Sequence, residues 1–134
     1  MKKALRRILW VLTGLIALNF LVMGLRWAVT PSGAAEALNM SLFNGAALSS
    51  QIGDVGGLFL CMGLFVLLGM VTKKCEWFLA TSMLVYAIAV FRILAWLFHG
   101  ASLVMPLIVP EIVIGTLLLI ASRKLAADQS QKPE

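Results

Sequence analysis

The chain has 134 residues, of which 61% are hydrophobic and 13% are charged. A soluble domain is roughly half apolar and a quarter charged, so this composition excludes an ordinary soluble protein and predicts an integral membrane protein with one domain. The net charge of +5 would favour nucleic-acid binding in a soluble protein. Here the basic residues stand at the ends of apolar runs, which is typical of membrane topology, and we expect no nucleic-acid partner.

The first apolar run covers residues 8–29 and follows a short basic segment, residues 1–7. This arrangement resembles a secretory signal peptide, and residues 35–37 even resemble a cleavage site. However, the apolar run is longer than the roughly 7–15 residues of a typical signal core. We therefore expect residues 8–29 to be retained as the first membrane span.

Residues 30–51 form the one long connection between predicted spans, and Glu36 is its only charged residue. A connection of this length is usually functional or disordered, but its scattered apolar residues argue against a solvated linker. These residues are Leu38, Met40, Leu42, Phe43 and Leu48. We expect a short helix at the membrane surface, which is either a packed connector or a lid over a site.

The second predicted span, residues 52–71, is rich in glycine. Gly53, Gly57 and Cys61 recur every four residues and therefore share one helical stripe. Small residues at this spacing let helix backbones approach closely within a membrane. The stripe is expected to pack within this chain or, as the alternative, to support dimerisation.

The third and fourth spans are predicted at residues 77–98 and 103–121. A basic turn at 72–76 precedes the third span, and a short turn at 98–102 precedes the fourth. The polar residues 122–134 are expected to form a disordered tail. The sequence therefore predicts an all-α fold, an antiparallel bundle of four membrane helices.

The distribution of basic residues predicts the orientation of this bundle. Nine Lys and Arg residues lie in the N-terminal segment, the second loop and the tail, whereas the first and third loops contain none. Such asymmetry is the positive-inside pattern. We expect a multi-pass protein of the bacterial inner membrane with both termini in the cytoplasm.

Each predicted span carries one ionisable residue in its outer half. At 1.5 Å per residue, Arg26 lies ~5 Å deep, Asp54 ~3 Å, Arg92 ~9 Å and Glu111 ~12 Å. A guanidinium stays charged, and a charge in hydrocarbon requires a partner or water. Arg92 is expected to meet Glu111, with Arg26 and Asp54 nearer the surface. His99 follows Arg92 by two helical turns and is expected on the same face at the rim.

Two prolines in the fourth span, Pro106 and Pro110, lack backbone donors. If the helix continues through them, the carbonyls of Ser102 and Pro106 lose their helical partners. Freed carbonyls at membrane depth need protein or water. A kink beside Glu111 is therefore expected to open a small wet cavity towards the outside.

The polar centre has three interpretations: an ion pair that specifies packing, a ligand site or a proton relay. The sequence contains no nucleophile motif, phosphate loop or metal-ligand spacing, and we expect neither an enzyme nor a bound cofactor or metal. The leading hypothesis is a protein that binds a small amphiphile, a lipid or a partner membrane protein, or that forms a homo-oligomer. The alternative is a small proton-coupled exporter in which Glu111 cycles its proton.

Residues 56–65 form a Gly-Gly-Leu run, followed by Arg92 in the third span and Glu111 in the fourth. This pattern resembles a family of uncharacterised small four-span bacterial inner-membrane proteins that is catalogued as a domain of unknown function. The resemblance covers residues 53–121 well and the first span only loosely. It implies an antiparallel four-helix bundle and draws attention to Arg92 and Glu111, but it implies no activity.

Overall fold

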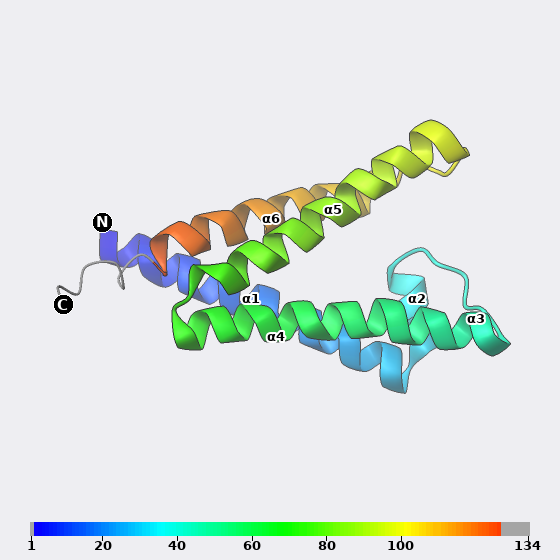
Figure 1. Ribbon diagram of the computed structural model, residues 1–134, viewed down its shortest axis with the longest axis horizontal. Helices are drawn as coiled ribbons and strands as arrows, with labels where there is room; N and C mark the ends of the chain where they lie inside the picture. The colour runs from blue at the N-terminus through cyan, green and yellow to red at the C-terminus, as the bar shows by residue number, and fades with distance from the viewer. Residues whose placement is uncertain (1, 127–134) are drawn as a thin grey trace.

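The structure is a computed structural model that describes residues 2–126 and is built from helices (Figure 1). Four helical segments are long and apolar enough to span a membrane, so the predicted class, an all-α membrane bundle, is confirmed. These segments are Lys2–Val29, Gly45–Thr72, Cys75–His99 and Met105–Lys124. The predicted tail, 122–134, begins inside the last helix, and its residues 127–134 lie outside the described part.

The long connection is shorter than expected because helical structure resumes early. The elements are α1 (Lys2–Val29), α2 (Pro31–Ala37), α3 (Gly45–Ser50), the π-helical turn η1 (Gln51–Gly56), α4 (Gly57–Thr72), α5 (Cys75–His99) and α6 (Met105–Lys124). The second apolar helix starts at Gly45 rather than at the predicted Ile52. Residues 46–51 contain neither proline nor a β-branched residue, so nothing in them opposes a helix.

Helices α1 and α4 pack closely along a seam of glycines. A Cβ atom added to Gly24 would lie 2.7 Å from the backbone nitrogen of Leu60. A Cβ atom on Gly63 would lie 2.9 Å from the backbone nitrogen of Leu21. The two backbones therefore touch where only glycine fits, which is how membrane helices commonly associate.

The glycines of this seam are not those of the predicted stripe. A Cβ atom on Gly53 or Gly57 would meet nothing within 4 Å, and Cys61 is exposed. The expectation that this stripe packs within the chain is therefore wrong, and its role in dimerisation stays a prediction. Glycines occur on several faces of this helix, so spacing alone does not identify the packed face.

Helices α5 and α6 are joined by polar contacts instead. The Ser82 hydroxyl donates to the carbonyl oxygen of Gly115 at 2.9 Å. Further along, the hydroxyl oxygens of Tyr86 and Thr116 lie 2.8 Å apart and share a hydrogen bond. Hydrogen bonds between membrane helices add specificity to packing, so this pair is held in one register.

The α1–α4 pair and the α5–α6 pair meet through an apolar core on the side of the N-terminus. Figure 1 shows that the two pairs diverge towards the opposite end, called here the distal end, which contains α2, α3 and the turn after α5. The buried residues of the shared core are Leu9, Ile16, Ala17, Phe20, Met62, Val66, Phe78, Val85, Leu118, Ala121 and Leu125. The divergence leaves space between the pairs at the distal end.

The two prolines of α6 have different consequences from those predicted. Pro106 lies in the first turn of the helix, where its missing N–H leaves no helical carbonyl unpaired. The predicted loss at the Ser102 carbonyl therefore does not occur. Pro110 lies inside the helix, and it removes the donor for the carbonyl of Pro106. One turn of α6 beside Glu111 is thus weakened.

Candidate functional site

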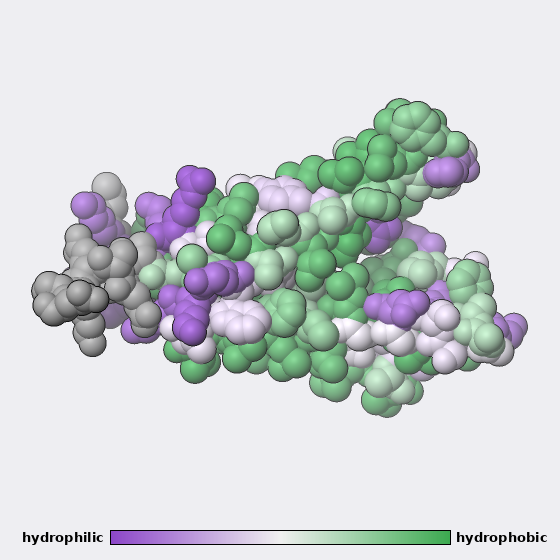
Figure 2. All heavy atoms as spheres, in the orientation of Figure 1, coloured by the Kyte–Doolittle hydropathy of each residue, from purple (hydrophilic) through white to green (hydrophobic). Residues whose placement is uncertain are grey.

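A cleft of about 330 Å³ lies between the two helix pairs. The space-filling view shows this hollow where the pairs diverge, and hydrophobic residues cover much of the molecule around it (Figure 2). The residues that line the cleft are Phe20, Leu38, Met40, Val55, Leu58, Phe59, Met62, Val85, Ile88, Arg92, Glu111 and Ile114. Ten of these twelve side chains are apolar, and the two charged side chains in the lining are Arg92 and Glu111.

The predicted contact between Arg92 and Glu111 is present. The Nε–H group of Arg92 donates to Oε1 of Glu111 at 2.9 Å, and the two side chains are 29% and 17% exposed. The pair lies about 10 Å of helix from His99 at the end of α5 and about 9 Å from the start of α6. Both charges are thus well inside the candidate spans and face a partner, as buried charges require.

One oxygen of this carboxylate has no hydrogen-bond partner within the described residues 2–126. Glu111 Oε2 is buried, and no donor within residues 2–126 forms a hydrogen bond with it. A buried carboxylate oxygen without a donor is costly. The Nε–H group of Arg92 donates a hydrogen bond to the other oxygen, Oε1. The guanidinium carries further N–H donors on its two terminal nitrogens.

The structure does not bring the other three predicted site residues to this pair. Arg26 donates from Nη2 to the carbonyl oxygen of Gly33 at 3.0 Å, which ties α1 to α2. Asp54 is exposed on η1, and His99 is exposed at the tip of α5. None of the three lines the cleft. Arg26 and Asp54 belong to the α1–α4 side, which diverges from α5 and α6 at this depth.

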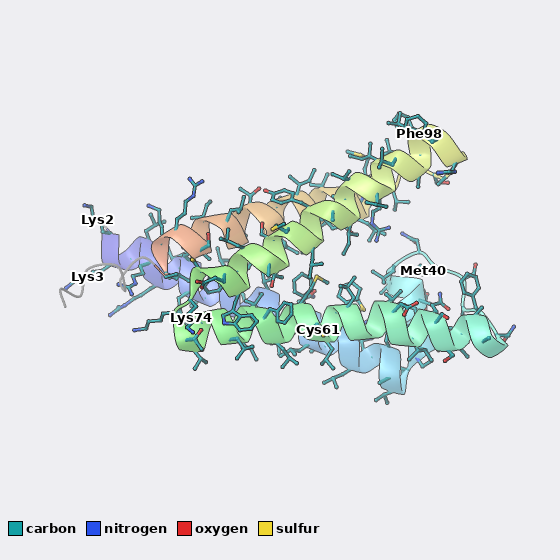
Figure 3. The ribbon with its side chains drawn as sticks, in the orientation of Figure 1. Lys2, Lys3, Met40, Cys61, Lys74 and Phe98 are labelled. Carbon is teal, nitrogen blue, oxygen red and sulfur yellow. The ribbon has the colours of Figure 1, made fainter. Side chains whose placement is uncertain are left out.

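The segment between α2 and α3 is packed, as predicted for a connector, and it also forms part of the cleft wall. Its role as a lid stays a prediction. Leu38 and Met40 line the cleft, and Figure 3 shows Met40 on the side of the α1–α4 pair that faces α5. Apolar residues within an otherwise polar connection were the sequence signal for this contribution.

Gln51 anchors this segment, and sequence reasoning missed it. Its side-chain nitrogen donates to the carbonyl oxygen of Ser41 at 3.0 Å, and its side-chain oxygen accepts from the N–H of Phe43 at 3.1 Å. Gln51 is 5% exposed and begins the π-helical turn η1. Such turns are frequent at functional sites, but nothing in the sequence distinguishes this glutamine from a surface residue.

Arg92 is also accessible from the side of the bundle. It contributes to a shallow groove of about 430 Å³ that runs along α5. The groove is otherwise apolar and is formed by Leu84, Ala87, Ile88, Phe91 and Ala95. Since Arg92 and Ile88 line both the groove and the cleft, they stand at the boundary between the cleft and the membrane-facing surface.

The described part of the chain contains no set of side chains that could bind a metal ion. Across residues 2–126, no three His, Cys, Asp or Glu side chains come close enough to hold a metal ion. The chemistry that the cleft does offer is an apolar wall, guanidinium donors and one carboxylate acceptor. This combination suits recognition of a molecule with an apolar body and a polar head.

Comparisons with protein-family models, with curated proteins and with solved structures found no match to this chain. The resemblance of residues 53–121 to a family of four-span proteins therefore stays a prediction. A fold of this kind hosts unrelated functions, so the geometry of the cleft is the physical basis for a function.

Proposed function

We propose that this protein binds a membrane amphiphile in the cleft between the α1–α4 and α5–α6 pairs. The observation that carries the proposal is the placement of the Arg92–Glu111 pair in the wall of an otherwise apolar cleft. Ligand sites typically combine apolar walls with a few polar groups that fix orientation. An amphiphile matches this pattern, with its chain against the apolar wall and its head at the pair.

The position of the pair supports entry from the membrane. Arg92 and Glu111 lie about 9–10 Å inside the distal ends of their helices. Arg92 also borders the groove on the membrane-facing side of α5. A lipid-like molecule would thus reach the pair sideways, without leaving the apolar part of the bilayer.

The core beneath the cleft favours binding over transport. A proton-coupled exporter, the predicted alternative, would need a polar route from Glu111 to the side of the N-terminus. Buried apolar side chains occupy that direction, among them Ile16, Val66 and Phe78. The buried hydroxyl groups of Thr13, Thr81 and Ser82 already donate to backbone carbonyls, so a charge crossing this packed region would lose its water for few partners.

A cavity-filling variant tests the proposal. Ile88 lines the cleft, and an indole at this position would occupy the space proposed for the acyl chain of the amphiphile. Val90 is half-exposed on the same helix, so Val90→Trp is the matched control. The probe is lauroyl glycerol, added to the protein in lipid nanodiscs and detected by native mass spectrometry.

Wild type and Val90→Trp should each retain one molecule of the probe, and Ile88→Trp should lose it. Equal retention by all three proteins would mean that the probe binds elsewhere on the lipid-facing surface and would overturn the proposal. The proposal would also be overturned if none of the three proteins retained lauroyl glycerol and none retained two related probes, laurate and methyl laurate. A co-purifying protein displaced by Ile88→Trp would instead identify a partner protein as the occupant.

A further inference from the structure

We infer that the amphiphile bound in the cleft has an uncharged head group that carries both a hydrogen-bond donor and an acceptor, such as the hydroxyl of a monoacylglycerol. This inference rests on the proposed function and specifies the ligand class of the same site. It follows from three observations on the described residues: the charge balance of the cleft, the hydrogen-bonding atoms of its ion pair and the size of the space.

The charge balance of the cleft excludes a charged head. Arg92 and Glu111 are the charged residues among those that line the cleft within residues 2–126, and they are paired at 2.9 Å. Arg26 is turned to Gly33, and Asp54 lies on the exposed face of η1. An ionic head would therefore add a net charge to an apolar surrounding, which is costly without a counter-charge.

The hydrogen-bonding atoms that the pair presents specify what the head can offer. Glu111 Oε2 is buried and accepts from no residue in the 2–126 range, so it requires a donor. The terminal nitrogens of Arg92 carry N–H donors beyond the Nε–H that Glu111 uses, so they can donate to an acceptor on the head. A hydroxyl group provides both at once, and hydrogen bonds to charged partners are the stronger kind.

Other common heads fail one of these requirements. An ionised fatty acid offers acceptors to Arg92 but no donor to Glu111, and it brings a second negative charge beside that carboxylate. A methyl ester offers an acceptor only. A trimethylammonium head offers neither a donor to Glu111 nor an acceptor to Arg92, and it adds a net charge to the neutral pair.

The volume of the cleft favours a lipid with a single acyl chain. About 330 Å³ is at the lower end of the roughly 300–1,000 Å³ typical of ligand pockets. The groove along α5 shares Ile88 and Arg92 with the cleft and offers further apolar surface for an acyl chain that extends out of the cleft. A neutral single-chain lipid with a hydroxylated head therefore fits both the cleft and its lateral exit.

Four probes with the same lauryl chain length and different heads test the inference: lauroyl glycerol, laurate, methyl laurate and lauryl trimethylammonium. Each is titrated into wild-type protein in nanodiscs at neutral pH, with one-to-one complexes counted by native mass spectrometry. Lauroyl glycerol should bind about tenfold tighter or more than the other three, the loss expected when a charged group lacks one hydrogen-bond partner. Laurate binding as tightly as lauroyl glycerol would overturn the inference.

The variant Glu111→Gln tests the charge argument separately. It leaves the charge of Arg92 without compensation, so laurate should become the tightest of the four probes. An unchanged order of affinities in a folded variant would show that the pair does not select the head and would overturn the inference. Should this variant fail to fold, the wild-type titration decides alone.

The same titration distinguishes failure of the head-group inference from failure of the proposed function. Equal binding of all four probes, lost in Ile88→Trp but not in Val90→Trp, would overturn the head-group inference and leave the proposed function standing. Absence of binding by every probe would overturn the proposed function itself.

Discussion

The hydrogen bond between Arg92 and Glu111 joins two neighbouring helices of the same pair and does not cross the cleft. The hydrogen bond between Ser82 and Gly115 likewise joins α5 to α6, on the same side of the cleft as the ion pair. The width of the cleft is thus not fixed by the ion pair. Apolar packing holds the two pairs together, in the core near the N-terminus and where Leu107 of α6 packs against the cluster around Trp27 and Leu38.

Removal of the guanidinium should destabilise the protein moderately. Arg92→Ala leaves the Glu111 carboxylate without its donor, and the pair is neither fully buried nor at the surface. We expect a loss of roughly 1–3 kcal/mol, between the values for exposed and buried pairs. Thermal unfolding in mild detergent measures this loss. Replacing both residues, Arg92→Met with Glu111→Leu, should recover much of it.

Arg26→Ala is the control for this measurement, because Arg26 is exposed and donates to a backbone carbonyl. Its cost should stay below about 1 kcal/mol. An Arg92→Ala protein as stable as wild type would contradict the structural importance of the pair and indicate that the guanidinium is satisfied by lipid head groups or water.

The glycine seam predicts opposite effects for two alanine substitutions in the α1–α4 pair. Gly24→Ala would drive a methyl group to 2.7 Å from the backbone nitrogen of Leu60, and backbone cannot move aside cheaply. A loss of roughly 1–3 kcal/mol is expected from this overpacking. Gly57→Ala meets open space and should be neutral or stabilising by up to about 1 kcal/mol.

Both variants are compared by thermal unfolding at the same lipid-to-protein ratio. If Gly57→Ala were the more damaging change, the outward stripe of Gly53, Gly57 and Cys61 would be an interface between copies of the chain. Size measurements in detergent would then show a dimer that the variant disrupts.

Gln51 should control the order of the segment between α2 and α3, which forms part of the cleft wall. Gln51→Ala removes the hydrogen bonds to Ser41 and Phe43 together. Backbone amides of residues 40–44 should then exchange hydrogen faster, and lauroyl glycerol should dissociate faster. Asn44→Ala is the matched control, because the Asn44 side chain makes no capping bond to α3. Equal exchange in the two variants would show that the segment is held by apolar packing alone.

Topology provides an independent prediction. Nine basic residues in the terminal segments and the second loop, against none in the first and third loops, predict cytoplasmic termini. A C-terminal reporter that is active only in the periplasm should stay silent, and a reporter active only in the cytoplasm should give a signal. The reverse result would place the Arg92–Glu111 pair in the inner leaflet, and the amphiphile would then come from that side.

The sequence alone was sufficient for the four apolar helices and for the partnership of Arg92 with Glu111. Both depend on strong one-dimensional signals. Apolar runs of spanning length have few alternatives to a membrane helix. A guanidinium in such a run requires a partner or water, and the Glu111 carboxylate lay at a similar depth on the next span.

The tertiary structure alone decided which face each helix presents and where the bundle opens. Glycines on several faces of α4 left its seam undetermined, and depth along a span contains no information on direction around it. For that reason Arg26, Asp54 and His99 were assigned to the same polar centre from the sequence, although none of them lines the cleft. The cleft lies between the two helix pairs, and the Gln51 side chain bridges back to Ser41 and Phe43 beside it. Packing between elements far apart in the sequence determines where the helix pairs diverge.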